Sequence, residues 1–259
     1  MKEKKTALVT GASGGLGLAF ARLLAEEKYD LVLVPRSSDK LSLLKGELEQ
    51  KYGISAYVCR ADLSQVDAAQ GVLAFTQAQG LVVDVLINNA GFGDAGSFAE
   101  ADWQKQANMV QVDITALMQL THLFLPGMIE RKSGAILNLS SVAAFSAGPY
   151  MSIYYASKAF VRSFSEAVAE EVRGTGVTVT ALCPGPTATG FEAAADMGNN
   201  SRMFQRAAKA EDVARAGLRA MQKGKVLCYQ GSFTKCMGFF CRILPRSVTR
   251  KYARRMNEK

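Results

Sequence analysis

Histidine and tryptophan are almost absent from this 259-residue chain, which holds one of each. The single histidine, His122, lies in the apolar stretch LMQLTHLFLPGM, where we expect an ordinary helix residue. A catalytic triad built on histidine or a metal site with several histidines is therefore excluded, and we expect no metal ligands. The five cysteines are odd in number and show no C-x-x-C spacing. This cysteine usage predicts reduced thiols in a cytoplasmic protein.

Long apolar runs are also missing. No stretch of about 18 uncharged apolar residues occurs, because each apolar stretch carries polar residues or ends in charges. The N-terminus, MKEKKTALVTGA, leads from a charged stub directly into a strand-like segment and shows no signal-peptide pattern. With 49% hydrophobic and 21% charged residues, the composition is that of a globular protein with a large buried core.

Acidic residues are scarce near the C-terminus. From Arg215 to Lys259 the chain holds 12 lysines and arginines and 1 acidic residue, a balance of +11. The rest holds 19 basic and 22 acidic residues, a balance of −3, so the net charge of +8 is concentrated in the tail. This distribution predicts a local role for the tail and argues against a nucleic-acid-binding protein.

Short apolar runs alternate with longer segments of helical period, which is typical of βαβ units with a parallel sheet. Strands are expected at 6–10, 30–34, 55–59, 84–88, 135–140, 177–183 and 225–229, and helices at about 15–27, 39–52, 65–78, 101–131, 152–173 and 211–223. The sequence therefore predicts an α/β fold, a doubly wound Rossmann-type parallel sheet of about seven strands with helices on both faces. Residues 1–231 would form this domain, with a lid over the substrate at about 190–208, and residues 232–259 a basic amphipathic extension.

A glycine-rich turn, TGASGGLG, follows the first predicted strand and opens the first predicted helix. Its glycines Gly11, Gly15 and Gly17 are spaced G-x-x-x-G-x-G. A backbone without Cβ atoms lets a pyrophosphate approach the helix N-terminus and its free N–H groups. A flexible surface turn is the alternative interpretation, but the position after the first strand of a βαβ pattern favours a dinucleotide site.

Tyr154 and Lys158 are four residues apart in a predicted helix, so their side chains project from one face. Ser141 lies thirteen residues before Tyr154. At ~4 Å and an effective dielectric of ~20, an ammonium attracts a phenolate by about 4 kcal/mol before desolvation costs. Because one pKa unit is ~1.4 kcal/mol, Lys158 would draw the tyrosine pKa from ~10 toward the physiological range. Such a phenol can donate a proton to a carbonyl oxygen or accept one from an alcohol.

Together these motifs resemble those of the classical short-chain dehydrogenase/reductases. The family motifs TGxxxGxG, NNAG, Ser…YxxxK and PGxxxT appear here as TGASGGLG, NNAG at 88–91, Ser141 with YYASK at 154–158, and PGPTAT at 184–189. The resemblance runs from about Thr6 to Ala220 and is closest to the branch that reduces ketones and 3-oxoacyl or steroid-like substrates. It implies an NADP(H)-dependent enzyme of lipid metabolism that acts on a small carbonyl or alcohol substrate as a homodimer or homotetramer. A hydroxysteroid dehydrogenase and a nucleotide-binding regulatory protein with weakened catalysis are the alternatives.

The resemblance also implies roles for single residues. Ser141 would bind the substrate oxygen, Tyr154 would act as general acid, and Lys158 would hold the nicotinamide ribose. The neighbours Ser140 and Tyr155 compete for the first two roles but lack the family spacing. Asp62 matches an adenine contact, although a turn residue is an equal alternative. The expected cofactor-binding residues are Gly11, Ser13, Gly15, Leu16, Gly17, Arg36, Asp62, Asn89, Ala90, Gly91, Tyr154, Lys158, Pro184, Gly185, Thr187 and Thr189.

The end of the second predicted strand bears on cofactor choice. NAD-binding proteins of this kind place an acidic residue there to bind the ribose 2′-OH. This chain reads VLVPRSS, so Pro35 replaces the acid and Arg36 follows. An arginine near Ser13 suits a 2′-phosphate, and a solvated surface arginine is the alternative. We therefore expect NADPH or NADP+ as the cofactor.

Asp113 departs from the family pattern, which usually has asparagine where this chain reads MVQVDIT. The main-chain carbonyl of that asparagine commonly holds a water in a proton relay, and an aspartate keeps the carbonyl. We therefore count Asp113 among the catalytic residues. Its side chain would place a negative charge near Lys158, leaving activity preserved, slowed or shifted in pH. Asn108, five residues earlier, is out of register and is expected to be an ordinary helix residue.

Apolar residues of the tail recur at helical spacing. This tail stripe consists of Phe233, Cys236, Met237, Phe240, Ile243 and Leu244. Pro245 interrupts it, and SVTRKYARRMNEK could form a second, basic helix. In the favoured interpretation the stripe packs on the domain or closes the substrate pocket. In the second, it contacts an anionic membrane peripherally, with lysines and arginines at the headgroups.

Overall fold

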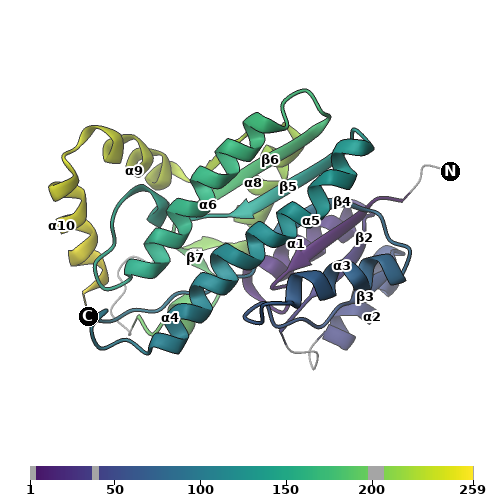
Figure 1. Cartoon of the computed structure of the whole chain (residues 1–259), viewed down its shortest axis with the longest axis horizontal. Helices are drawn as coiled ribbons and strands as arrows, with labels where there is room; N and C mark the ends of the chain where they lie inside the picture. Colours follow the sequence, from purple (N-terminus) through teal and green to yellow (C-terminus); the bar gives the residue numbers. More distant parts are fainter. Residues whose placement is uncertain (1–3, 37–40, 198–206, 259) are drawn as a thin grey trace.

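A seven-stranded parallel sheet forms the centre of the molecule (Figure 1). The computed structural model describes residues 4–36, 41–197 and 207–258. The strand order is β3-β2-β1-β4-β5-β6-β9, which confirms the predicted doubly wound fold. These strands are β1 (Thr6–Thr10), β2 (Asp30–Val34), β3 (Ala56–Val58), β4 (Val83–Asn88), β5 (Gly134–Leu139), β6 (Val177–Pro184) and β9 (Leu227–Gln230).

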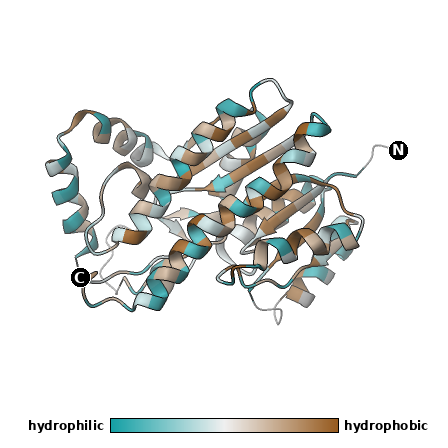
Figure 2. Ribbon diagram, viewed as in Figure 1, coloured by the Kyte–Doolittle hydropathy of each residue, from teal (hydrophilic) through white to brown (hydrophobic). Residues whose placement is uncertain are grey.

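Helices cover both faces of the sheet and bury a hydrophobic core on each. One core packs α1 (Gly15–Glu26), α2 (Leu41–Tyr52) and α8 (Ala210–Gln222) on the sheet. The other packs α3 (Ala68–Ala78), α5 (Leu117–Glu130) and α6 (Ser152–Glu171). Along β1, Val9 belongs to the first core and Leu8 to the second. Because both faces are buried, the strands are continuous apolar runs, as Figure 2 shows for the central strands.

The strand order reverses between β1 and β4. The chain builds β1, β2 and β3 outward on one side, then returns to lay β4 beside β1. In open parallel sheets, the ligand crevice lies at the carboxyl ends of the strands beside this reversal. The Thr10 hydroxyl ties the two strand ends together, because it accepts the backbone N–H groups of Asn89 and Ala90 at 3.0 and 2.9 Å.

One long helix runs across the second face. It consists of α4 (Trp103–Val110), the π-helical turn η1 (Gln111–Ala116) and α5. By length and composition alone, its 28 residues could cross a membrane, with a mean hydropathy of 1.3 in the most apolar window. The sequence predicted no membrane-spanning segment. This is weak evidence for a span, because 44% of that window is buried and core helices of soluble proteins pass the same test.

The C-terminal third adds smaller elements and a helical pair. Its smaller elements are β7 (Thr187–Ala188), α7 (Phe191–Ala194) and β8 (Ala208–Lys209), and the pair is α9 (Ser232–Ile243) and α10 (Arg246–Asn257). The short helix η2 (Val142–Phe145) lies earlier, between β5 and α6. The pair forms a hook at the end of the molecule away from the N-terminus (Figure 1). Part of the predicted lid, residues 198–206, lies outside the described residues, so the lid and the domain division stay predictions.

The predicted boundaries differ from the observed ones mainly at the sheet edges. The strand expected at 55–59 is reduced to β3, which pairs with β2 over three residues. The strand expected at 225–229 begins later, as β9. Edge strands have one neighbour, so propensity without a pairing partner predicts their ends poorly.

Candidate active site

A cavity of about 650 Å³ lies at the carboxyl ends of the central strands. Its wall combines the glycine turn with the segments that follow β4, β5 and β6 and with residues of the C-terminal helices. Of the predicted site residues, all line this cavity except Gly17 and Asp113. The structure therefore brings together residues from Gly11 to Thr189, while their individual roles remain predictions.

The glycine turn depends on missing side chains. Gly11 and Gly15 have φ angles of +64° and +53°, in the left-handed region that glycine favours. A Cβ on Gly17 would lie 2.2 Å from the carbonyl oxygen of Gly11, so only glycine lets α1 approach the turn this closely. The cap of α1 is Gly14, which has no side chain to bind the first N–H groups, and the first turn holds no acidic residue. This helix terminus fits a phosphate, which would accept its N–H groups.

Two asparagines hold the end of β4. The side-chain amide of Asn89 donates to the carbonyl oxygens of Thr10 and Gly11, at 2.8 and 3.3 Å. The amide of Asn88 donates to Thr121 Oγ1 at 3.1 Å and to Asn138 Oδ1 at 2.9 Å. Asn88 is therefore a buried structural residue under the site, whereas Asn89 both lines the cavity and fixes the glycine turn.

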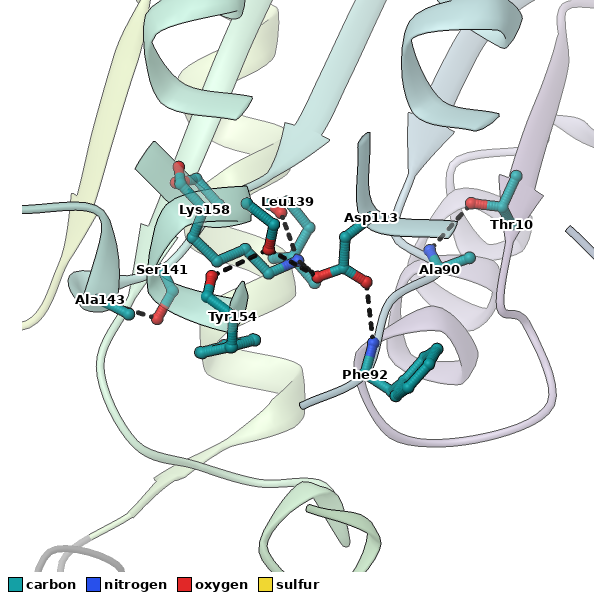
Figure 3. Close-up of polar contacts among 11 residues, drawn as sticks. Thr10, Ala90, Phe92, Asp113, Leu139, Ser141, Ala143, Tyr154 and Lys158 are labelled. Atoms are coloured by element: carbon teal, nitrogen blue, oxygen red, sulfur yellow. Dashed lines mark hydrogen bonds and ion pairs between the residues drawn. The ribbon is translucent and has the colours of Figure 1, made fainter. Parts of the chain in front are cut away.

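Ser141 and Tyr154 face each other in the cavity (Figure 3). Ser141 caps η2, where its Oγ accepts the N–H of Ala143 at 3.1 Å. Tyr154 lies in the first turn of α6, and its ring packs on that of Phe191 at 5.1 Å between centroids. Burial raises the pKa of the Tyr154 phenol far above its ordinary value; the hydrogen bond with Ser141 opposes this rise and the charge of Asp113 adds to it.

Asp113 and Lys158 form a buried ion pair beside this tyrosine. Lys158 Nζ lies 3.0 Å from Asp113 Oδ2, and the two side chains are 5% and 0% exposed. Asp113 Oδ1 accepts the N–H of Phe92 at 3.0 Å, and the Ser157 hydroxyl lies 3.1 Å from Oδ2 (Figure 3). A Cβ on Gly91 would lie 2.9 Å from Asp113 Oδ1 and 3.0 Å from Lys158 Nζ, so this glycine leaves room for the pair.

The sequence-based expectation for the tyrosine pKa is wrong in this structure. Lys158 Nζ lies 5.5 Å from the centre of the Tyr154 ring, but its charge is opposed by the carboxylate of Asp113. Burial and this carboxylate both raise the pKa of Tyr154, which favours the neutral phenol. A neutral phenol is the form that can donate a proton to a carbonyl oxygen.

The far end of the cavity carries the residues predicted to choose the cofactor. Ser13 and Arg36 are both exposed and line it. Asp62 also lines it, but its Oδ1 accepts the N–H and the hydroxyl of Ser64 at 3.1 and 2.9 Å, as in a turn. The loop after β6 closes against the glycine turn, because a Cβ on Gly15 would lie 3.0 Å from that of Thr189.

Sequence reasoning missed several cavity residues. Asn108 was expected to be an ordinary helix residue, yet it lines the cavity while accepting a hydrogen bond from Gln104 at 2.9 Å. Other residues without a spacing signal line the substrate end: Phe92, Met151, Tyr155, Tyr252, Met256 and Asn257. They come from segments far apart in sequence, so no motif spacing links them. Only the apolar or amide chemistry of their side chains could have suggested that they belong to the cavity wall.

The favoured expectation for the tail stripe is mostly wrong. Met237 is half-buried and lines the cavity, which agrees with pocket closure. Cys236, Phe240, Ile243 and Leu244 are exposed, so they do not pack on the domain. The side chain of Phe233 lies outside what the structure describes. The helix instead packs through the small residues Thr234 and Gly238, which are buried.

Fold and site together define a dinucleotide-binding α/β protein with a Ser–Tyr–Lys group in its crevice. Residues 5–200 match the family model described as short chain dehydrogenase. This chain belongs to the short chain dehydrogenase family, as its motifs predicted.

The relatives of the chain include ketoreductases and a hydroxysteroid dehydrogenase, in agreement with the predicted branch. A very-long-chain 3-oxoacyl-CoA reductase of Laccaria bicolor is 36% identical, over 70% of this chain and 54% of the relative. A 7beta-hydroxysteroid dehydrogenase of Collinsella aerofaciens is 35% identical, over 70% and 68%. The chain thus spans about half the length of the Laccaria relative.

Two solved structures extend the likeness to nearly the whole fold. A 7beta-hydroxysteroid dehydrogenase has a TM-score of 0.87 at 27% identity, covering 96% of each chain. A short-chain dehydrogenase from Sphingobium yanoikuyae, in complex with NADPH, has a TM-score of 0.82 at 25% identity, covering 94% of this chain and 97% of the other.

Proposed function

We propose that this protein is an NADP(H)-dependent oxidoreductase that reduces a lipophilic ketone, of 3-oxoacyl or steroid-like kind, to an alcohol. The convergence of Ser141, Tyr154 and Lys158 in a cavity that begins at the glycine turn carries this proposal. The 3-oxoacyl-CoA reductase and hydroxysteroid dehydrogenase among the relatives support the substrate class. Apolar residues such as Met151, Phe191 and Met237 at the substrate end also suit an oily substrate.

The residues present fit NADPH. The uncapped N-terminus of α1 and the missing Cβ atoms of Gly11, Gly15 and Gly17 leave a cradle for a pyrophosphate. Arg36 supplies a cation where an acidic residue would repel a 2′-phosphate. The structural relative in complex with NADPH supports this choice. When bound, NADPH supplies the hydride that reduces the carbonyl carbon.

The chain itself handles the proton. Ser141 orients the substrate oxygen by a hydrogen bond, and the neutral phenol of Tyr154 donates the proton to that oxygen. Lys158 would hold the ribose of a bound cofactor, and its charge would stabilise the phenolate that forms when Tyr154 gives up its proton. Asp113 positions Lys158 through the buried ion pair and sets how much of that charge the tyrosine experiences.

Replacing the proton donor tests this assignment. We expect Tyr154→Phe to reduce ketone turnover to below a few per cent of wild type while leaving the Kd for NADPH nearly unchanged, because the ring still packs but has no proton to donate. Steady-state turnover and cofactor titration by nicotinamide fluorescence measure both quantities. Tyr155→Phe is the matched control, because its ring also lines the cavity. Substantial turnover by the Tyr154→Phe variant would show that another group is the acid.

The Asp113–Lys158 ion pair favours a second candidate, a nucleotide-binding regulatory protein with weakened catalysis. An ammonium held by a carboxylate at 3.0 Å is less available to a tyrosinate or a ribose. A panel of small, acyl-chain and steroid ketones separates the candidates. Reduction of any class supports the enzyme and identifies its substrate, whereas NADPH binding without turnover across the panel supports the regulatory protein.

We further propose that the protein acts in the cytoplasm on a small carbonyl or alcohol substrate, as a homodimer or homotetramer, with peripheral contact to anionic membrane through residues 232–259. The family resemblance supports the oligomer, and the basic composition of the extension supports the membrane contact. Light scattering on the purified protein measures the oligomeric state, and a monomer at micromolar concentration would contradict this part.

A further inference from the structure

Helix α9 has the reverse of the usual surface pattern. Its inward side carries Thr234 and Gly238, both buried, and Gly238 packs close to the rings of Phe145 and Tyr229. Its outward side carries large apolar side chains among those that the structure describes. We call Phe239, Phe240, Ile243 and the following Leu244 the outer face; they are 61%, 50%, 64% and 41% exposed. Surface helices of globular proteins normally turn such residues inward, so this outer face is a candidate contact surface.

Basic residues predominate in the two helices that carry and follow the outer face. Across the described residues 232–258, seven cations stand against one acidic residue, Glu258, which pairs with Arg254 at 3.2 Å. Figure 2 shows α10 mainly in the hydrophilic colour. The cations are all exposed: Lys235, Arg242, Arg246, Arg250, Lys251, Arg254 and Arg255.

We propose that the outer face of α9 docks onto an anionic lipid bilayer. Phe239, Phe240 and Ile243 enter the headgroup–acyl boundary, and the cations of both helices bind lipid phosphates. A second copy of this chain is the poorer partner, because docking two such faces would bring together like charges of about +6 each. The residues that would contact the bilayer point away from the domain of this protein. Docking would therefore leave the packing of α9 and α10 on the domain undisturbed.

The docking surface borders the substrate end of the cavity. Met237 on α9 and Met256 on α10 line this cavity, while Tyr252 lines it and is also 47% exposed, at its rim. A docked molecule would therefore hold the rim against the bilayer, and an apolar ketone dissolved in the lipid could enter without crossing water. The docking specifies the membrane contact proposed above for residues 232–259, and the delivery step rests on the proposed reaction.

Vesicle sedimentation tests the docking with the full chain. We expect the protein to sediment with vesicles of phosphatidylcholine and phosphatidylglycerol at low salt, weakly with pure phosphatidylcholine, and less as salt rises, because salt screens the cations. Free glycerol phosphate should not compete at millimolar concentration, since it lacks the acyl boundary. No sedimentation with anionic vesicles at low salt would overturn the proposal.

Paired variants separate the outer face from general stickiness. We expect Phe239→Ser combined with Ile243→Ser to raise the lipid concentration for half-binding by about tenfold or more. The matched control, Leu43→Ser with Val66→Ser, removes two apolar side chains that are 80% and 70% exposed elsewhere and should bind as wild type. If both double variants lost vesicle binding equally, or if the Phe239→Ser, Ile243→Ser variant lost none, the proposal would be overturned.

Two double variants that remove positive charges test the role of the cations. Arg246→Gln with Arg250→Gln should weaken binding about tenfold or more and flatten its salt dependence, whereas Lys45→Gln with Lys51→Gln on α2 should do neither. NADPH titration of the same variants shows that the cavity is intact. Turnover of a soluble short ketone reports on the proposed reaction separately, so loss of vesicle binding with normal turnover concerns the surface alone. Undiminished binding by the first charge pair would overturn the role given to the cations.

Discussion

Asp113 links three parts of the site at the scale of single residues. Its carboxylate pairs with Lys158 at 3.0 Å and accepts the N–H of Phe92 at 3.0 Å. It also raises the pKa of Tyr154 through its charge. The sequence predicted a negative charge near Lys158, but not a direct ion pair, because the distance depends on the π-helical turn that carries Asp113 and on the missing side chain of Gly91.

Neutralising this carboxylate has a predictable pH effect. Asp113 raises the pKa of Tyr154, so Asp113→Asn should lower it. Reduction requires the protonated phenol, so the rate of ketone reduction falls at high pH as the phenol ionises. In the variant this fall should begin at lower pH. The rate of alcohol oxidation, which rises as the phenol ionises, should shift in the same direction. Activity at neutral pH should equal or exceed that of wild type. The pH profile of kcat measures this shift.

The same substitution should lower stability, because it leaves Lys158 buried without its counter-charge. We expect the free energy of unfolding of the cofactor-free protein to fall by about 3 kcal/mol. Asp94→Asn is the matched control, since Asp94 pairs with Lys105 away from the cavity lining. A pH profile that moves equally in both variants, or in neither, would remove Asp113 from the proton chemistry.

Arg36 gives a second prediction at this scale. Arg36→Asp should weaken NADPH binding by at least about tenfold more than NADH binding, because it removes a cation and adds repulsion toward the 2′-phosphate. Titrations with both cofactors measure the ratio. Arg60→Asp, a charge reversal outside the cavity lining, serves as the control. Equal losses for NADPH and NADH would show that the change had damaged the common pocket.

At the scale of elements, the approach of α1 to β1 decides whether the glycine turn can form. Gly17 lies in the first turn of α1, directly over the carbonyl oxygen of Gly11. The motif spacing predicted glycine here for the cofactor, yet Gly17 does not line the cavity. Its role in this structure is the close contact of helix and turn, which places the helix N-terminus at the cavity.

A single methyl group should disrupt this contact. Gly17→Ala would place a Cβ 2.2 Å from the Gly11 oxygen and 2.7 Å from Asn89 Nδ2, so backbone must move. We expect a loss of about 2 kcal/mol or more in the free energy of unfolding, together with weaker NADPH binding. Gly46→Ala is the control, because its new methyl group would meet no atom within 4 Å and the higher helix propensity of alanine should stabilise α2 slightly. Urea unfolding measures these free energies, and equal values for the two variants would contradict this account.

At the scale of the whole molecule, the cavity joins the dinucleotide fold to the helical hook. Asn257 of α10 accepts the hydroxyl of Tyr155 at 3.2 Å and donates to the carbonyl of Pro149 at 3.0 Å. These bonds fix the C-terminal helix over the substrate end, more than 100 residues away along the chain. The cofactor end, in contrast, is built from residues before the hook.

Removing the hook should therefore affect substrate binding but not cofactor binding. Deletion of residues 232–259 should leave the Kd for NADPH within about twofold, while the KM for a long-chain ketone rises about tenfold or more relative to a small ketone, since an apolar wall is lost. Thermal melting monitors the fold of the truncated protein. Asn257→Ala, which loosens α10 without exposing the cavity fully, should show a smaller effect in the same direction. Equal changes in KM for both ketones would exclude a wall function.

The sequence by itself determined the elements, their order and the family of this protein. Alternating apolar runs and helical periods specify a parallel sheet, and the glycine turn, Ser141, Tyr154 and Lys158 carry local chemistry at short spacing. Only the tertiary structure decided which charged groups lie in contact and which helix faces are exposed. The ion pair of Asp113, the raised pKa of Tyr154 and the outward turn of the α9 aromatic residues depend on burial and on partners distant in sequence, which periodicity and spacing do not encode.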